Sequence, residues 1–363
     1  MTVYYYYATL ASCNNYYRLF QLYYSSKGGL SLIRIDLENH FYAPCLIDAL
    51  AQRSQPPFYD RATDQIHWTE DVCMPQGELL QRLLEVGEHR LSLLEQQGIT
   101  HAVLSCSPGA EQLEPAKSIA VCQATNAALY ELTRAHPGRL FGSAILPVKD
   151  VATAERELER CVKEYGFVSW HTHSNYGNTA PDDPRYLPLF RKAAELGVYV
   201  YLHPQLPEGS RYAGYGFTFA GPGLGFTVDT VTTLLRMVVS GLFDEIPSLR
   251  LVLGHLGEGL PFLLDRIENR IKFLPNPAIR CRRPLRYYFQ HNIWVTTSGN
   301  MSPEAFRCTQ DVLGMDHILF ASDYPYESVE DMMAFLRGIP LNEADYARLY
   351  YQNAEALLGI SLS

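Results

Sequence analysis

The segment LRLVLGHLGEGLPFLLDRIENRIKFL (249–274) contains the repeating unit from which the fold can be predicted. Its first six residues form a short, mainly apolar run, which is typical of a strand buried on both faces of a parallel sheet. Apolar residues at helical spacing follow over 259–274. The segment therefore predicts one strand followed by one helix.

The same order of a short apolar run and a longer helical pattern recurs along the chain. Eight units in 363 residues favour a closed (β/α)8 barrel, the TIM barrel of the α/β class, over a doubly wound sheet. The predicted strands cover 32–37, 101–106, 140–146, 167–172, 198–202, 249–254, 292–297 and 317–322. The predicted helices cover 78–97, 112–136, 151–164, 184–195, 227–243, 259–274, 303–313, 328–337 and, last, 343–358.

Two insertions interrupt this rhythm, and both are rich in Pro, Gly and Tyr. Residues 41–77 follow the first strand and residues 204–226 follow the fifth. Because loops after the strands of such a barrel form the face that carries active sites, we expect both to line the site. We expect residues 32–363 to form one domain. Residues 1–31 form a Tyr-rich N-terminal extension to which we assign no role.

Composition and charge restrict the partners and the compartment. The formal net charge is -9 and there is no long Lys/Arg run, which argues against binding to nucleic acid or to an anionic membrane. No apolar run approaches the length of a membrane span, and the N-terminus does not resemble a secretory signal. The eight cysteines are scattered without a CxxC pair, which is typical of reduced thiols in a cytoplasmic protein.

Potential metal ligands stand at the ends of several predicted strands. Strict alternation along the first strand places Asp36, Glu38 and His40 on one side, so that Glu38 and His40 both face the barrel mouth. His203 ends the fifth strand and Asp323 ends the eighth. Imidazole and carboxylate together suit zinc or another first-row divalent ion. Each residue alone has a structural alternative, such as a helix N-cap for Asp323, but their joint position predicts one divalent metal ion.

These motifs resemble those of the amidohydrolase superfamily, specifically the amidohydrolase-2 branch of metal-dependent aromatic acid decarboxylases of the γ-resorcylate and 5-carboxyvanillate type. The resemblance covers roughly residues 33–360. It is carried by Glu38-Asn39-His40, by YLHP (201–204), by GHLGEG (254–259) and by SDYP (322–325). The Glu-x-His form of the first motif is that of the decarboxylases, whereas hydrolytic branches have His-x-His.

The resemblance implies a carboxy-lyase that binds one zinc or manganese ion through Glu38, His40, His203 and Asp323. The metal would chelate the carboxylate and the ortho oxygen of a hydroxylated aromatic acid, and the ring carbon would be protonated before CO2 leaves. Asp323 and His255, the latter held by Glu258, are the two candidate proton donors. A hydrolase or hydratase of the same superfamily, acting on a lactone or related small carboxylate, remains the alternative. A barrel that only binds a ligand would have lost a metal ligand, and none is missing.

Substrate contacts are predicted at Arg90, His173, Arg266 and Tyr326. Arg90 would balance the substrate's charge, or else cap a helix or form an interface salt bridge. The resemblance implies that one of Arg266 and Arg270, on the helix after GHLGEG, acts in the neighbouring subunit's site, and that the protein is a homodimer or homotetramer. His173, where close decarboxylases have a small polar residue, would contact the substrate or act as an extra metal ligand or second acid. Further candidates are Arg236 and Arg270 for charge, Tyr324 for the pocket wall, and His171 beside His173.

Overall fold

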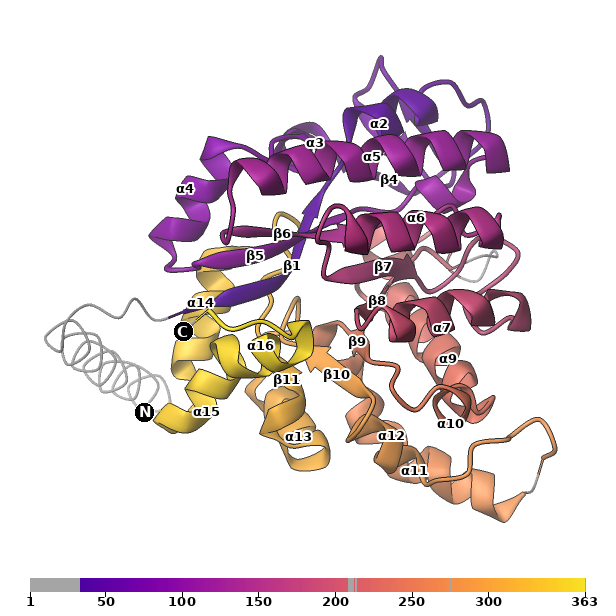
Figure 1. Cartoon of the computed structure of the whole chain (residues 1–363), viewed down its shortest axis with the longest axis vertical. Coiled ribbons are helices and arrows are strands. Elements are labelled where there is room, and N and C mark those ends of the chain that lie inside the picture. The colour runs from indigo at the N-terminus through magenta and orange to yellow at the C-terminus, as the bar shows by residue number, and fades with distance from the viewer. Residues whose placement is uncertain (1–32, 208–211, 213, 275, 363) are drawn as a thin grey trace, which may run out of the picture.

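The computed structural model describes residues 33–207, 212, 214–274 and 276–362. Within these ranges one sheet has eight strands in the order β1-β5-β6-β7-β8-β9-β10-β11, and all its neighbouring strands run parallel (Figure 1). The strands are β1 (Ile35–Phe41), β5 (His101–Cys106), β6 (Leu140–Ala144), β7 (Ser169–His173), β8 (Tyr199–His203), β9 (Leu251–Leu253), β10 (Ile293–Thr296) and β11 (Ile318–Leu319).

The sheet closes between its first strand and the segment that follows its last. The backbone N–H of Leu37 donates to the carbonyl of Phe320 at 3.2 Å, and that of His40 donates to Tyr324 at 2.7 Å. In the opposite direction, the N–H of Asp323 donates to the carbonyl of Glu38 at 3.0 Å. The predicted (β/α)8 barrel is therefore confirmed, with a seam that consists of irregular chain rather than a regular ladder.

Helices follow the strands and cover the outside of the barrel (Figure 1). In α6, for example, the carboxylate of Asp150 caps the first turn by accepting the N–H of Thr153, and Ala154, Leu158 and Cys161 form the buried face. The longer helices are α3 (Gly77–Leu84), α4 (Glu88–Gln96), α5 (Pro115–Ala135), α6 (Val151–Lys163), α7 (Leu187–Glu195), α9 (Gly225–Val239), α11 (Leu260–Phe273), α13 (Pro303–Leu313) and α14 (Val329–Gly338). Shorter ones are η1 (Ala110–Gln112), η2 (Pro184–Tyr186), α10 (Leu242–Glu245), η4 (His255–Gly257), α12 (Leu285–Phe289), η5 (Met315–His317), α15 (Glu343–Ala347), η6 (Arg348–Gln352) and α16 (Asn353–Leu358).

Both insertions contain folded elements where we predicted irregular loops. The first holds α2 (Pro44–Leu50) and an antiparallel sheet of β2 (Phe58–Asp60), β3 (Gln65–His67) and β4 (Cys73–Gln76). The second holds α8 (Gly216–Ala220). The predicted helix over 78–97 is two helices, because the Glu85 carboxylate accepts the N–H groups of Gly87 and Arg90 and so starts a second helix.

The barrel interior and the layer between strands and helices form separate apolar clusters. The interior cluster includes Ile35, Leu37, Val103, Tyr199 and Tyr201. No helix in the described part of the chain is long and apolar enough to cross a membrane. The N-terminal extension, residues 1–31, lies outside the described residues.

Candidate metal centre and active site

A β-bulge in β1 places its two metal-ligand candidates. The register with β5 shifts between Asp36 and Asn39, so the strict alternation predicted for this strand is wrong. Asp36 and Asn39 hydrogen-bond to each other on the helix side, where Asn39 also accepts from Arg90 of α4. Beyond the bulge, His40 faces the barrel interior and contacts Ser105 of β5.

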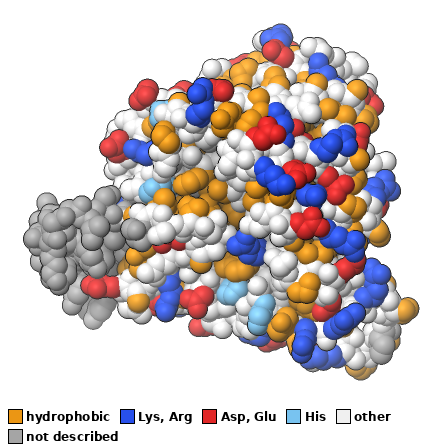
Figure 2. Space-filling view, viewed as in Figure 1, with side chains coloured by type: hydrophobic (Ala, Val, Ile, Leu, Met, Phe, Trp, Pro, Cys, Tyr) orange, Lys and Arg blue, Asp and Glu red, His pale blue; other side chains and the backbone are white. Residues whose placement is uncertain are grey.

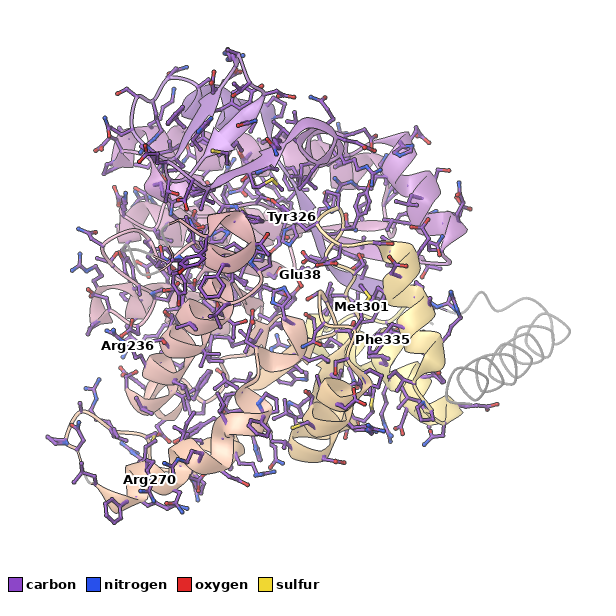
Figure 3. All side chains as sticks on the ribbon, turned by 180° about the vertical axis from the view of Figure 1, so that it is seen from behind. Glu38, Arg236, Arg270, Met301, Tyr326 and Phe335 are labelled. Carbon is purple, nitrogen blue, oxygen red and sulfur yellow. The ribbon has the colours of Figure 1, made fainter. Side chains whose placement is uncertain are left out.

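The four predicted ligands converge at the carboxyl ends of β1, β8 and β11. His40 Nε2 lies 3.2 Å from Asp323 Oδ1 and 3.5 Å from Glu38 Oε1. His203 Nε2 lies 3.8 Å from the same Glu38 oxygen. Figure 3 labels Glu38 near the middle of the molecule, with Tyr326 beside it. The structure therefore brings together residues that are up to 285 positions apart, since Glu38 and Asp323 are the outermost of the four.

The donor atoms of this cluster fit a metal ion. Glu38 Oε1, His40 Nε2 and Asp323 Oδ1 are all buried and have no hydrogen-bond partner among the described residues. One atom of each of these three residues lies within 4.8 Å of the others. Buried polar atoms are almost always hydrogen-bonded, and a divalent ion is the partner that suits mixed carboxylate and imidazole donors. His203 donates its Nδ1–H to the carbonyl of Pro204 at 2.6 Å, which leaves Nε2 free to bind a metal.

The electrostatics of the cluster also suit a cation. Burial would raise the pKa of Glu38, but the nearby imidazoles, His40 above all, outweigh it and hold the pKa below its usual value. Burial would lower the pKa of His40, but the carboxylates of Asp323 and Glu38 raise it to about 9. A proton on His40 therefore balances the carboxylates in the absence of metal, and a metal ion must displace it.

His255, which is partly exposed, and the buried Glu258 form a pair beside the ligand cluster. His255 Nδ1 donates to Glu258 Oε1 at 2.6 Å, and the other oxygen of Glu258 accepts from Thr227 at 2.6 Å. His255 Nε2 then lies 3.8 Å from Asp323 Oδ2. Burial alone would lower the pKa of His255, but the carboxylates of Glu258 and Asp323 keep it well above its usual value. These carboxylates thus favour the protonated form of His255, whose Nε2 faces the predicted ligand Asp323.

The backbone is strained where it presents these side chains. His255, Glu258 and Asp323 have φ angles of 55°, 54° and 63°, in the left-handed region that non-glycine residues rarely occupy. Each such conformation costs of the order of 1–3 kcal/mol and persists only where the surrounding structure enforces it. Gly299 permits the close approach of His255, because a Cβ at position 299 would lie 2.7 Å from His255 Cδ2.

A cavity of about 150 Å³ opens above the cluster and is lined by His203, His255, Asp323 and Tyr326. Both insertions contribute apolar walls, Trp68 and Met74 from the first and Leu206, Phe217 and Phe226 from the second. None of the described residues that line it is Lys or Arg. The cavity therefore combines a polar floor with an aromatic and aliphatic wall, which suits a small flat molecule with polar groups along one edge.

Residues 94–360 match the amidohydrolase family. The chain belongs to the amidohydrolase family. It is 36% identical over 293 residues to a γ-resorcylate decarboxylase from Rhizobium sp. strain MTP-10005, covering 77% of this chain and 89% of that protein. The structure resembles that of a dihydroxybenzoic acid decarboxylase from Polaromonas sp. JS666 with bound manganese and 2-nitroresorcinol (31% identity, TM-score 0.77, 90% and 96% of the two chains). It also resembles that of a 5-carboxyvanillate decarboxylase from Novosphingobium aromaticivorans with manganese and 4-hydroxy-3-methoxy-5-nitrobenzoic acid (25%, 0.81, 92% and 98%).

Arg90 does not line the cavity of this amidohydrolase. Its side chain is fully buried behind β1, where the guanidinium donates to Asn39 Oδ1 at 2.7 Å and to the carbonyl of His40 at 2.6 Å. It also lies over the ring of Tyr324, 5.0 Å from the centroid. Burial lowers the pKa of Arg90 to about 10, so the group stays charged at neutral pH. These contacts support a structural role for Arg90 and not a contact with the substrate. Tyr324 packs against Arg90 and is not part of the cavity wall.

The remaining arginine candidates also lie outside the cavity of this subunit. Arg236 pairs with Asp182 at 2.7 Å. Arg266 and Arg270 line a separate surface hollow on α11, and Figure 3 labels Arg270 at the outer end of that helix, far from Glu38. A role for Arg266 within its own chain is therefore excluded by position, whereas a role in a neighbouring subunit stays a prediction.

The structure adds Asp36 to the site, and it distinguishes His171 from its neighbour His173. Asp36 was assigned no role, yet its buried carboxylate accepts from the N–H and the hydroxyl of Ser322, next to the ligand Asp323. Burial raises its pKa to about 6 in spite of these hydrogen bonds. Of the two histidines of β7, the structure brings His171, not His173, into a group of potential metal donors. His173 instead pairs with the buried Glu111 at 2.6 Å.

Proposed function

We propose that this amidohydrolase is a metal-dependent, non-oxidative decarboxylase of a hydroxylated aromatic carboxylic acid. One observation carries the proposal: a cluster of buried, unpartnered metal donors adjoins a hydrogen-bonded His255–Glu258 pair on the floor of an aromatic-walled cavity. Relatives of this chain are named as decarboxylases of dihydroxybenzoic and carboxyvanillic acids, and two of their structures hold manganese with a substrate-like nitrophenol.

The cofactor in this proposal is one divalent ion, zinc or manganese, held by Glu38, His40, His203 and Asp323. When bound, the ion supplies Lewis acidity and chelates the carboxylate and ortho oxygen of the substrate. None of the described residues that line the cavity is Lys or Arg, so among these residues the metal ion and His255 are the partners for the substrate's charge. Tyr326, whose hydroxyl donates to Ser107, is fixed in position to pack against the substrate.

His255 holds the proton that the reaction requires. Its Nδ1–H is engaged by Glu258, so the proton available for transfer is on Nε2, directly or by way of Asp323 Oδ2 at 3.8 Å. Transfer to the ring carbon that bears the carboxylate uses a ring π pair to form the C–H bond. The C–C bond then breaks, CO2 leaves, and its bonding pair restores the aromatic ring. His255 regains a proton from water, and Glu258 keeps the imidazole in the required orientation.

A substrate screen tests this function. The protein loaded with zinc or manganese is incubated with ortho-hydroxybenzoates, 5-carboxyvanillate and simple lactones, and CO2 release is followed together with product spectra. We expect CO2 and the corresponding phenol from at least one aromatic acid, and a loss of turnover without loss of metal in His255→Asn. Lactone hydrolysis without CO2 from any phenolic acid would reject decarboxylation in favour of the hydrolase alternative.

We further propose that the active form is a homodimer or homotetramer in which α11 packs against a neighbour. Phe262, Phe273 and Leu274 of this region are 80%, 73% and 72% exposed, which is unusual for large apolar side chains. Figure 2 draws Lys and Arg side chains gathered at the lower right, where Figure 1 draws α11 and α12. Such an interface would bring the partner's copy of Arg266 toward the cavity.

Mixing two inactive variants tests this arrangement. Light scattering on the wild type gives the mass of the assembly, which we expect to be two or four chains. A mixture of Arg266→Ala and His255→Asn subunits should regain activity, because one hybrid site then has both groups intact. A monomeric mass, or no recovery in mixed assemblies, would contradict the proposal.

A cytoplasmic location is part of the proposal and is supported by the seven free cysteines of the described residues.

A further inference from the structure

A second group of potential metal donors adjoins the carboxylates. One ring nitrogen each of His40, His171 and His203 lies within 4.8 Å of the others, and all three residues are buried. His40 is common to this group and to the group of Glu38, His40 and Asp323. The His171 ring centroid lies 5.6 Å from that of His40 and 5.1 Å from that of His203.

The strand geometry explains why His171 reaches this position. In β7 the side chain of Trp170 packs outward against Phe190 of α7, so the alternate residues His171 and His173 face the barrel interior. The register with β8 pairs His171 with Tyr201, and His173 with His203. His171 therefore lies one layer deeper than His203, at the floor of the cluster, rather than in the cavity wall.

Position relative to the other donors distinguishes the two histidines of β7. The Nε2 atoms of His171 and His173 are both buried, and no described residue hydrogen-bonds to either. His173 is held by Glu111, which lies 2.6 Å from its Nδ1, whereas His171 belongs to the group of potential metal donors. A buried polar atom without a partner is unfavourable, because it has given up its hydrogen bonds to water. Nothing in the proposed decarboxylation uses His171, so this cost is unexplained unless another group binds the ring.

We propose that His171 is a further ligand of the metal ion and that the resulting three-imidazole set makes the site select zinc over manganese. Carboxylate oxygens suit manganese, whereas imidazole nitrogens suit zinc. Glu38, His40 and Asp323 alone offer two oxygens and one nitrogen; adding His171 and His203 makes nitrogen the majority. One nitrogen of each imidazole lies within 4.8 Å of the others, so a small inward movement of the side chains would let one ion bind all three. The inference rests on the proposed metal dependence but not on the reaction.

Competitive metal binding tests the proposal on the full chain without substrate. Dissociation constants for zinc and manganese are measured by dialysis against a buffered chelator, with metal content determined by mass spectrometry. His171→Asn is expected to weaken zinc binding at least tenfold. Replacing a residue that only orients a metal ligand already lowers the affinity for the metal by about 10- to 100-fold. Manganese binding should change much less, so that the zinc-to-manganese selectivity falls. Equal losses for both metals, or no loss, would overturn the proposal.

Two further measurements keep the test independent of folding and of function. His173→Asn is the matched control, because it removes the neighbouring imidazole that Glu111 already engages, and its selectivity should equal that of the wild type. X-ray absorption at the zinc edge of the unaltered protein should count three imidazole ligands; a count of two would reject His171 as a ligand even if its variants do not fold. If zinc binds through His171 but no CO2 is released, this inference stands and the decarboxylase is rejected. If CO2 is released but His171 is not a ligand, the decarboxylase stands and this inference is rejected.

Discussion

The position of a side chain in the site depends on the residues that pack directly behind it. His255 occupies a left-handed backbone conformation and contacts Gly299, which itself has φ of +64°. Glycine at 299 thus serves two purposes, because it adopts that angle without strain and leaves room for the imidazole. Gly299 thereby helps to position His255, the proposed proton donor.

We predict that Gly299→Ala impairs catalysis but not metal binding. The new Cβ would lie 2.7 Å from His255 Cδ2 but 3.7 Å from Asp323 Oδ2, so the imidazole must move while the ligand need not. A displacement of about 1 Å can reduce the rate on the order of 100-fold. Gly359→Ala is the control, since it has a similar φ of +69° and no atom within 4 Å of its Cβ. Steady-state kinetics and metal content check the prediction, and equal effects of both substitutions would contradict it.

Arg90 supports the ligand strand through its hydrogen bonds. Besides Asn39 and His40 it donates to the carbonyls of Arg82 and Glu85, so it fastens both α3 and α4 to β1. Arg90→Met should lower the free energy of unfolding by roughly 3 kcal/mol or more, because several buried acceptors lose their donor. Arg61→Met, which removes an exposed ion pair with Asp48, should cost less than about 1 kcal/mol.

Urea denaturation of both variants measures these differences. The alternative, that Arg90 binds the substrate's carboxylate, predicts the opposite pattern. In that case the KM of Arg90→Met would rise while its unfolding midpoint stayed at the wild-type value.

At the scale of elements, the sequence predicts periodicity well and local irregularity poorly. The eight strands and the helices after them follow from apolar spacing, because buried parallel strands require apolar residues on both faces. The bulge in β1 was not predictable, since a shift of register leaves no mark in the pattern of residue types around Asp36. The break after Leu84 was also missed, because it depends on a carboxylate of Glu85 that caps the next helix.

The short element η5 suggests a pH dependence of stability away from the active site. His317 donates from Nδ1 to the carbonyl of Ile293 and stacks on Trp294, with centroids 4.9 Å apart. Burial lowers its pKa below the usual value near 6.5. The folded state therefore favours the neutral ring, so its contribution to stability is complete above that value and is lost as the pH falls below it.

We predict that the wild type loses more stability than His317→Gln between pH 7.5 and pH 5.5, because only the wild type has this titrating ring. Urea midpoints at the two pH values measure the difference. All other titrating groups, including the metal ligands, are common to both proteins and cancel in the comparison. A parallel decline of the two midpoints would show that His317 is not responsible.

Over the whole molecule, the candidate ligands were predictable because parallel strands end at one face of the barrel. Glu38 and His40 lie in β1, His203 ends β8 and Asp323 follows β11, so the fold alone brings them together. The role of Arg90 could not be predicted correctly. Its position in a helix does not show whether the guanidinium points into the cavity or lies behind β1. His171 and His173 are equivalent in sequence, and only the register with β8 and the position of Glu111 distinguish them.

The metal site also lies across the seam of the barrel. Glu38 and His40 belong to the first strand and Asp323 follows the last, and the seam between them holds few regular hydrogen bonds. An ion bound by both sides would join the two ends of the sheet. We therefore predict that zinc or manganese stabilises the fold and slows hydrogen exchange at the seam amides of Leu37, His40 and Asp323.

The expected stabilisation follows from mass action. At a metal concentration about 1,000 times the dissociation constant it amounts to roughly 4 kcal/mol, if the unfolded chain binds no metal. Chelation should lower the melting temperature by several degrees, and Asp323→Asn should respond little to metal at the same concentrations because the seam loses a ligand. Hydrogen exchange of the metal-bound and metal-free proteins shows whether the metal protects the seam amides in particular or stabilises the whole barrel. Protection that rises equally over β5, β6 and the seam would mean that the metal does not act by joining β1 to the segment after β11.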